Sequence, residues 1–559
     1  MIKALRGALL FLSLYGLANT PLASLAQSAA GAGNNPVDVV KVEGGLVKGV
    51  PSDTQNVQVF KGIPFAALVG DENRWKPPMP VEPWKGVMVA DKWGDRALQD
   101  TDGDPDEPPV SENGLNLNVF TPAQSANAKL PVYMLIHGGA NRTGANSERD
   151  IYAAELAAKG IVVVSVQYRL GAFGFMALPE MAEENPEGVA GNYGLLDLVK
   201  ALEWIDDNIA GFGGDPETVT IGGQSAGAEN VTALLRTPRA REYFDRAFIS
   251  SGFTGFLPGK YVRAEEKLKQ NKEAVDKIFG RGVTLAELRA ITAEEYLEPW
   301  KGGQQSLARV MNDATARSQF YNIDGIVITE ESYDLMRPGA LQGLDIMIGS
   351  TADEYTGLGG DPEGTLTPEE FDRTMRAPRS YGKYGHYDDE YAKHYRPDTD
   401  LDAYRLSRRS TADKIFASIK ISSEYAKAHN QDLDVWTFYW DHAPPGRNEG
   451  FHGAYHAADL YYFNASLRDE EGQRKWTDPD YRMRDLATNY LANFIKTGNP
   501  NGERLPEWGQ TTPESGGQFM RFHQGYAYLV NETPYPSRDR YNRRIIMEAN
   551  GLTEEDIAN

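Results

Sequence analysis

The sequence predicts an α/β fold in which a mixed sheet is covered by helices. Two observations support this: short apolar runs rich in β-branched residues alternate with helical patterns, and no Gly/Ser- or Pro-rich linker divides the chain. We therefore expect one large domain, although 559 residues would allow about three or four by length alone.

The predicted elements follow from local patterns. Apolar residues at three- and four-residue spacing predict a helix over residues 195–209. Residues 256–340 are mostly helical and polar, and residues 378–400 are rich in Tyr, His and charge. Both segments are interpreted as excursions over the sheet, where lids and pocket walls usually arise. The predicted strands are residues 132–136, 161–166, 218–221 and 345–349.

The first residues have the order of a secretory signal peptide. Lys3 and Arg6 precede an apolar run over residues 8–18, and small residues end at Ala26 as a cleavage site requires. The run is too short to span a bilayer. A frayed N-terminal helix is the alternative, but both charges lie before the run. We expect residues 1–26 to be removed, and residues 27–559 to be exported to the periplasm or medium without a membrane anchor.

Composition excludes several classes of protein. The chain has no Cys, which excludes disulfides, thiolate metal sites and a cysteine nucleophile. A formal charge of −22 repels phosphate backbones, so we expect no nucleic-acid partner. Residues 100–107 are rich in carboxylates and could bind calcium, but they lack EF-hand spacing and favour a solvated acidic loop.

The central motif is Gly223-Gln224-Ser225-Ala226-Gly227. It follows the predicted strand 218–221 and opens a helical pattern over residues 226–235. A serine on a sharp strand-to-helix turn exposes its hydroxyl and needs small neighbours, because the backbone is strained. The helix N-terminus then faces the developing oxyanion. This context predicts a nucleophilic Ser225, against the alternative of a Gly-rich turn with a solvent-facing serine.

A second motif, His137-Gly-Gly-Ala140, directly follows the predicted strand 132–136. Small residues let backbone N–H groups approach a substrate carbonyl closely. We expect the N–H groups of Gly139, Ala140 and Ala226 to form an oxyanion hole. His137 is interpreted as a structural loop residue and not as the catalytic base.

Further ordered segments have a family pattern. They are Phe60-Lys-Gly-Ile-Pro-Phe65, Ser111-Glu112, Leu115-Asn-Leu-Asn-Val119, Gln167-Tyr-Arg-Leu-Gly-Ala-Phe-Gly-Phe175, Gly191-Asn-Tyr-Gly-Leu-Leu-Asp197, Phe212-Gly-Gly-Asp-Pro216 and Lys496-Thr-Gly-Asn-Pro500. With them, residues 42–508 resemble the type-B carboxylesterase family, the cholinesterase-like branch of the α/β hydrolases, in a bacterial-type secreted form. The resemblance implies an α/β-hydrolase fold: a large, mostly parallel central sheet, helices on both faces, and helical excursions that form the pocket and lid.

The resemblance also implies a triad in the order Ser, Glu, His. The acid segment matches Gly349-Ser-Thr-Ala-Asp-Glu354, which assigns Glu354 and leaves Asp353 as the alternative. The base segment matches His456-Ala-Ala-Asp-Leu460, and His452, which lacks the pattern after it, is the alternative. The histidine would take the serine proton, the glutamate would orient the imidazole, and water would release the acyl group. No metal or organic cofactor is required.

The resemblance assigns several supporting positions. Gln224, Ser251 and Asp459 would lie near the triad, and Gln224 is neutral where the family commonly has Glu. Residues 98–113 contain no aromatic residue, whereas cholinesterases place their ammonium-binding Trp in that loop, so choline esters are disfavoured. Two structural ion pairs are implied: Arg74–Glu112 and Arg169–Asp197.

The residues after Ala140 depart from the family, which often has an aromatic pair where this chain has Asn141-Arg142. We hypothesise that Arg142 lines the pocket entrance and favours esters that carry a carboxylate, such as the tricarballylic esters of fumonisin-type substrates. The alternative is that Arg142 pairs with a local acid such as Glu148 or Asp150.

The sequence therefore predicts an exported serine carboxylesterase that acts on small-molecule esters. A non-catalytic adhesion or binding protein on the same fold is disfavoured by the intact triad and oxyanion segments. An amidase or peptidase with the same triad stays an open alternative. Sequons that have a role only in a eukaryotic host lie at Asn141, Asn230, Asn464 and Asn531.

Overall fold

The structure is a computed structural model that describes residues 37–100, 106–253, 255–257, 261–316, 320–358, 366–376, 389–446, 449–468 and 474–558. Residues Pro36–Asn559 belong to one structural unit. The predicted signal peptide lies outside the described residues, as do residues 101–105 of the acidic stretch and residues 378–388 of the second predicted excursion.

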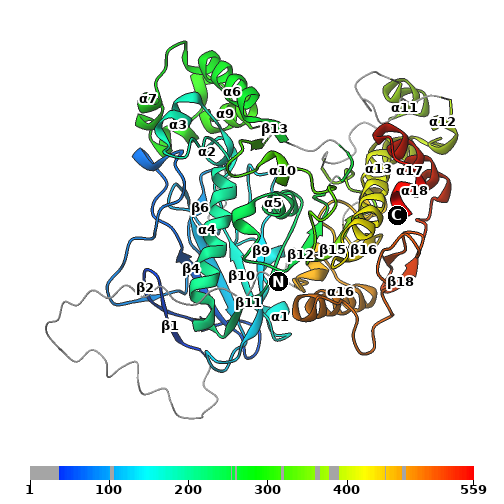
Figure 1. Cartoon of the computed structure of the whole chain (residues 1–559), viewed down its shortest axis with the longest axis horizontal. Coiled ribbons are helices and arrows are strands. Elements are labelled where there is room, and N and C mark those ends of the chain that lie inside the picture. The colour runs from blue at the N-terminus through cyan, green and yellow to red at the C-terminus, as the bar shows by residue number, and fades with distance from the viewer. Residues whose placement is uncertain are drawn as a thin grey trace. The chain divides into compact units, whose positions relative to one another are not determined.

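The centre of the fold is an eleven-stranded sheet (Figure 1). Its strands lie in the order β18 (Tyr526–Val530), β17 (Phe519–His523), β16 (Asp434–Trp440), β15 (Asp345–Thr351), β12 (Arg246–Ser250), β11 (Gly214–Gln224), β9 (Leu130–Ile136), β10 (Val162–Val166), β8 (Asn116–Thr121), β4 (Gln58–Pro64) and β3 (Val50–Pro51). Neighbours from β17 to β10 are parallel, and the outer pairs are antiparallel. The predicted α/β fold with a mostly parallel central sheet is confirmed.

All four predicted strands lie in this sheet, as β9, β10, β11 and β15. Every residue of β10 is buried, Ser165 included, because the strand lies inside the sheet and both of its faces are covered. Two of the predicted strands end later in the structure than the sequence suggests: β11 continues to Gln224 and β15 to Thr351. The reason is pairing: β12 and β16 hold these small and polar residues in the ladder although their side chains give no strand signal.

Helices cover both faces of the sheet. Met134 and Ile136 of β9 share a core with α4 and α5, whereas Tyr133 and Leu135, on the opposite side, share another core with α1 and α16. The side-chain alternation along each strand thus builds two cores. The covering helices are α1 (Ala154–Ala157), α4 (Tyr193–Asn208), α5 (Ala226–Leu235) and α16 (Asp478–Thr497).

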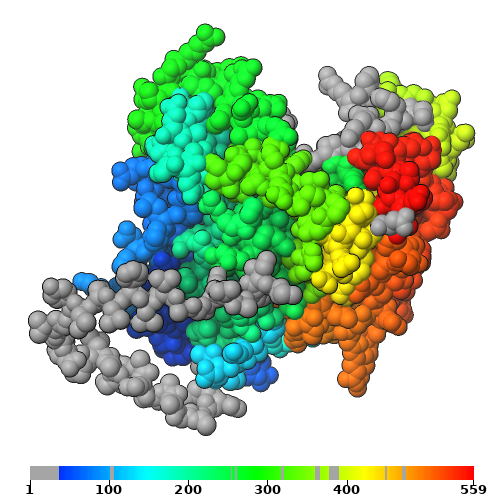
Figure 2. Space-filling model, in the orientation of Figure 1, coloured from blue at the N-terminus to red at the C-terminus, as the bar shows by residue number. Residues whose placement is uncertain are grey.

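Between β12 and β15 the chain leaves the sheet in a helical excursion. Its elements are β13 (Tyr261–Arg263), α6 (Ala264–Phe279), α7 (Leu285–Ala290), α8 (Ala293–Leu297), α9 (Leu307–Thr315), β14 (Tyr321–Ile323) and α10 (Glu330–Tyr333). Figure 1 shows α6, α7 and α9 gathered away from the central sheet, and Figure 2 shows this segment as a projecting green surface. The predicted excursion of residues 256–340 is confirmed for its described residues.

The remaining elements complete the fold. They are β1 (Val39–Val42), β2 (Gly45–Lys48), β5 (Val87–Val89), β6 (Arg96–Ala97), β7 (Val110–Ser111), α2 (Gly171–Phe175), α3 (Pro179–Glu184), α11 (Pro368–Met375), α12 (Tyr391–His394), α13 (Asp400–His429), α14 (Glu449–His452), α15 (Leu460–Phe463), α17 (Pro536–Asn550) and α18 (Glu554–Ala558). Within the described ranges, no helix is both long and apolar enough to cross a bilayer.

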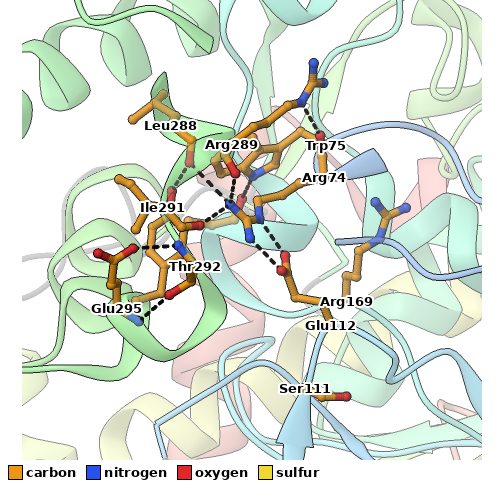
Figure 3. Close-up of polar contacts among 12 residues, drawn as sticks. Arg74, Trp75, Ser111, Glu112, Arg169, Leu288, Arg289, Ile291, Thr292 and Glu295 are labelled. Atoms are coloured by element: carbon orange, nitrogen blue, oxygen red, sulfur yellow. Dashed lines mark hydrogen bonds and ion pairs between the residues drawn. The ribbon is translucent and has the colours of Figure 1, made fainter. Parts of the chain in front are cut away.

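Two buried ion pairs join distant segments, and both predicted pairs are confirmed. Arg74 Nε and Nη2 each lie 2.5 Å from a carboxylate oxygen of Glu112 (Figure 3). Arg74 Nη1 also donates to backbone carbonyls at the end of α7 and just after it, including that of Ile291 at 2.8 Å, which fastens the excursion to the segment that carries Arg74. Arg169 donates to both carboxylate oxygens of Asp197, at 2.8 and 2.6 Å.

Candidate active site

Ser225 lies on the turn between β11 and α5, with φ 55° and ψ −126°. Residues other than glycine rarely adopt a positive φ, so this turn is strained, and it presents the hydroxyl at the end of the sheet. The flanking glycines are required by close contacts. A Cβ on Gly227 would lie 2.1 Å from the Ile136 carbonyl oxygen, and a Cβ on Gly223 would lie 2.6 Å from the Gly227 carbonyl carbon.

Three side chains from distant segments meet at this turn. His456 Nε2 lies 2.7 Å from Ser225 Oγ, and His456 Nδ1 hydrogen-bonds to Glu354 Oε2. Glu354 follows β15 and His456 follows β16, so the carboxyl ends of parallel strands bring them together. The other carboxylate oxygen of Glu354 accepts the Thr351 N–H at 2.9 Å, which fixes the orientation of the carboxylate.

Burial and charge act in opposite directions on the Glu354–His456 pair. Burial alone would raise the pKa of Glu354, but the charge and hydrogen bond of His456 outweigh it and lower the pKa. Burial alone would lower the pKa of His456, but Glu354 outweighs it and raises the pKa. The pair is therefore suited to stabilise an imidazolium formed when Ser225 loses its proton.

The two alternative residues point elsewhere. Asp353 is buried, pairs with Arg409 of α13 at 2.6 Å, and accepts the Ala454 N–H at 3.1 Å. His452 Nδ1 lies 3.2 Å from the Thr356 carbonyl oxygen. Both side chains hold loops in place, and the structure brings Glu354 and His456, rather than these neighbours, to Ser225.

The loop after β9 lies directly against the serine. A Cβ on Gly138 would be 3.3 Å from Ser225 Cβ, a tight contact that a glycine avoids. The chain then turns back on itself, because the N–H groups of Arg142 and Thr143 both donate to the Gly139 carbonyl at 3.0 Å.

The predicted oxyanion donors lie in this turn and at the start of α5, on either side of the nucleophile in the site. Gly139 and Ala140 have φ of 93° and 56°, and both are exposed. Among the described residues, neither of their N–H groups has a protein acceptor. Ala226 is the first residue of α5, so its N–H has no intrahelical partner either. Three N–H groups beside Ser225 are thus available to a developing oxyanion.

The structure places the three supporting residues near the triad. Gln224 Nε2 lies 3.3 Å from His456 Nε2. Asp459 is buried and accepts a hydrogen bond from the Ser250 hydroxyl at the end of β12. Burial, above all, raises the pKa of Asp459 to about 6. The Ser251 hydroxyl contributes to the lowered pKa of Glu354.

Arg142 forms an ion pair with Asp313 of α9. The sequence-based alternative named Glu148 or Asp150, and the structure corrects it to an acid 171 residues away. Arg309 Nε lies 3.4 Å from the second oxygen of Asp313. Burial would raise the pKa of Asp313, but Arg142 and Arg309 outweigh it and lower the pKa. Two arginines thus share one carboxylate.

Sequence reasoning missed a set of buried polar residues beside the oxyanion loop. Asn141 and Asn230 are both 0% exposed, and their amides bond to other buried groups. With Asn464 at 1%, three of the four sequons are buried and Asn531 is exposed. The available signal was the polar Asn141 at a position where an aromatic residue is common.

Metal-ligating side chains do not gather in the part of the chain that the structure describes. No group of three or more His, Asp or Glu side chains there is arranged to hold an ion.

Comparison with known proteins gives consistent matches. The profile described as "Carboxylesterase family" matches residues 36–532. The para-nitrobenzyl esterase of Bacillus subtilis is 30% identical over 490 residues, covering 85% of this chain and 94% of the relative. The fumonisin B1 esterase of Sphingopyxis macrogoltabida is 33% identical over 327 residues, 57% of each protein. A solved structure of a thermophilic pNB esterase is 27% identical with a TM-score of 0.73, covering 91% of this chain and 99% of that one.

Proposed function

The chain belongs to the carboxylesterase family, and from that premise we propose that Ser225, His456 and Glu354 catalyse ester hydrolysis through an acyl-enzyme. As a type-B carboxylesterase it acts on carboxylic esters. The observation that carries the residue assignment is the unbroken hydrogen-bond chain from Ser225 Oγ through His456 to Glu354.

In the acylation half-reaction, His456 Nε2 accepts the hydroxyl proton as Ser225 Oγ attacks the ester carbonyl. The carbonyl π electrons move onto oxygen, and the N–H groups of Gly139, Ala140 and Ala226 stabilise that oxyanion. When the tetrahedral intermediate collapses, the imidazolium gives its proton to the departing alkoxide, which leaves as an alcohol. Water repeats the sequence on the acyl-enzyme and releases the carboxylic acid, restoring the serine.

The proposal is tested by hydrolysis of a neutral short-chain p-nitrophenyl ester. We expect Ser225→Ala to lower kcat by at least about 10³-fold, because the nucleophile is lost while the oxyanion hole stays. An unchanged thermal midpoint would show that the variant is folded. Turnover at the wild-type rate in Ser225→Ala would contradict the assignment. Comparing an ester with its isosteric anilide separates the esterase from the amidase alternative.

We further propose that the enzyme favours esters that carry a carboxylate. Support comes from the Arg142–Asp313–Arg309 cluster, where two guanidinium groups face one carboxylate. The partial relative named fumonisin B1 esterase gives a second, weaker support. The test is the ratio of kcat/KM for a dicarboxylate monoester to that for a neutral ester. A ratio unaltered by Arg142→Ala would contradict the proposal.

Export is the remaining proposal about the whole protein. The order of charge, apolar run and small residues before Ala26 supports cleavage at that point. Expression of the full chain in a Gram-negative host and mass spectrometry of the product provide the test. We expect an exported protein that begins at Gln27. A cytoplasmic product that keeps Met1 would contradict the proposal.

A further inference from the structure

Three buried side chains form a closed ring of hydrogen bonds beside the oxyanion loop. Asn141 Nδ2 donates to the Tyr321 hydroxyl at 3.0 Å, and that hydroxyl donates to Asn230 Oδ1 at 2.8 Å. Asn230 Nδ2 completes the ring by donating to Asn141 Oδ1 at 2.9 Å. Each member donates once and accepts once around the ring, so each bond polarises the next. All three side chains are at most 1% exposed.

The ring joins the two structures that supply the oxyanion donors. Asn141 directly follows Ala140 in the loop, and Asn230 lies in α5, one helical turn after Ala226. Tyr321 belongs to β14 of the helical excursion. The ring therefore sets the separation between the loop donors and the helix donor. Through Tyr321 it also connects both of them to the helical excursion.

A fourth buried group holds the start of the same loop. The Tyr168 hydroxyl lies 3.1 Å from the His137 carbonyl oxygen and 3.0 Å from Asn141 Oδ1. Burial raises the pKa of Tyr168 and of Tyr321, so both hydroxyls keep the protons that they donate. The loop is thus held at its first residue and at Asn141, on either side of Gly139 and Ala140.

The backbone between these anchors needs such support. Ala140 has φ of 56°, in the left-handed region that an alanine side chain disfavours, and Asn141 follows with φ of 54°, which asparagine tolerates better. The Asn141 carbonyl also accepts the Gly171 N–H at 2.6 Å. A strained turn of this kind persists only where surrounding bonds determine it, and the ring supplies those bonds.

We propose that Asn141, Asn230 and Tyr321 are positioning residues of the oxyanion hole, an assignment that rests on the proposed function. The ring fixes the spacing between the Gly139–Ala140 donors and the Ala226 donor, and so sets how well three N–H groups converge on one oxyanion. Removing one donor from an oxyanion hole costs about 10²- to 10³-fold in kcat, and misplacing a donor costs part of that. Substrate binding in the ground state does not depend on this convergence.

The test uses Tyr321→Phe, which removes one hydroxyl and breaks two of the three hydrogen bonds of the ring. Asn141→Ala is the larger change. Tyr490→Phe is the matched control, because it also removes one hydroxyl from a buried tyrosine, whose hydrogen bond goes to the Pro506 carbonyl at 2.6 Å. The readouts are kcat and KM per titrated active site, and the inhibition constant of a trifluoromethyl ketone. That ketone forms a hemiketal with the serine and places an oxyanion in the hole.

For Tyr321→Phe we expect kcat to fall about 10-fold, KM to change less than about two-fold, and the ketone inhibition constant to rise in parallel with the loss of kcat. Tyr490→Phe is expected to leave all three values within about two-fold, although both variants lower the thermal midpoint. If Tyr321→Phe lowers only the thermal midpoint, the positioning proposal is wrong. If the wild type hydrolyses no ester, the proposed function is wrong, and ketone affinity still decides the role of the ring.

Discussion

The acid–base side and the oxyanion side of the site are held by different kinds of interaction. On the acid–base side, two neighbouring carboxylates are each paired with a potential cation: Glu354 with His456, and Asp353 with Arg409. On the oxyanion side, the ring centred on Asn141 contains only neutral groups. Charged pairs respond to pH and to the loss of one partner, whereas a neutral ring responds to the loss of a hydrogen bond.

The contrast also separates two neighbouring carboxylates. Both are buried, but the pKa of Glu354 is lowered by His456, whereas burial raises the pKa of Asp353 in spite of Arg409. The charge on Glu354 is stabilised next to the nucleophile, and the charge on Asp353 holds a loop. Identical chemistry therefore serves catalysis or stability according to its partner.

The largest expected effect distinguishes these two carboxylates. Glu354→Gln should lower kcat by about 10⁴-fold, because an amide cannot hold the imidazole in the required tautomer or stabilise its charge. Asp353→Asn should leave kcat within about 10-fold and instead lower the free energy of unfolding. Ester turnover and urea denaturation of both variants provide the check. A larger loss of kcat in Asp353→Asn than in Glu354→Gln would reverse the assignment.

The next effect concerns stability. Arg409→Met removes the cation that lies 2.6 Å from the buried Asp353 carboxylate and leaves only Arg405 to act on it. Losing one partner of a buried pair costs about 3–5 kcal/mol, and Arg405 offsets part of that. Arg376→Met is the matched control, because that arginine pairs with Asp372 on an exposed helix surface, where ion pairs contribute about 0–1 kcal/mol. Equal shifts of the urea midpoint in the two variants would show that the buried pair does not stabilise the loop.

The sequence predicted the acid–base side better than the oxyanion side, for a physical reason. Ser225 is marked by a local strand–turn–helix pattern, and Glu354 and His456 by short family segments, so each could be assigned within a few residues. The ring depends on pairs 89 and 180 residues apart, Asn141 with Asn230 and with Tyr321. No local pattern encodes such a pairing. The partner of Arg142 was sought among nearby acids for the same reason, and the structure places it on α9.

The pH dependence sharpens the contrast between the two sides. Activity needs neutral His456, and its pKa is raised above the usual 6.5 by Glu354, so kcat/KM should rise with pH up to a pKa above 6.5 and then level off. Stability changes with pH in the opposite direction. Because the pKa of His456 is raised in the folded state, its contribution to the free energy of unfolding is present below pH 6.5 and is lost as pH rises through the folded-state pKa. Tyr321→Phe should lower kcat without moving the kinetic pKa, since the ring is neutral. A shifted pKa in that variant would contradict the separation of the two sides.

The smallest effect is expected at the Arg142 corner, where charge lies on the oxyanion side but outside the ring. Asp313→Asn removes the carboxylate that Arg142 and Arg309 share, and should raise the preference for a carboxylate-bearing ester over a neutral ester by about 3- to 10-fold, as expected for one partly solvated charge. Asp276→Asn, which removes a carboxylate paired with Lys272 on α6, is the control for net charge. The change should shrink at high salt, because partly exposed charges are screened. Equal preferences in the two variants would mean that Arg142 serves only to hold α9 against the loop, and that the net charge of the corner does not reach the substrate.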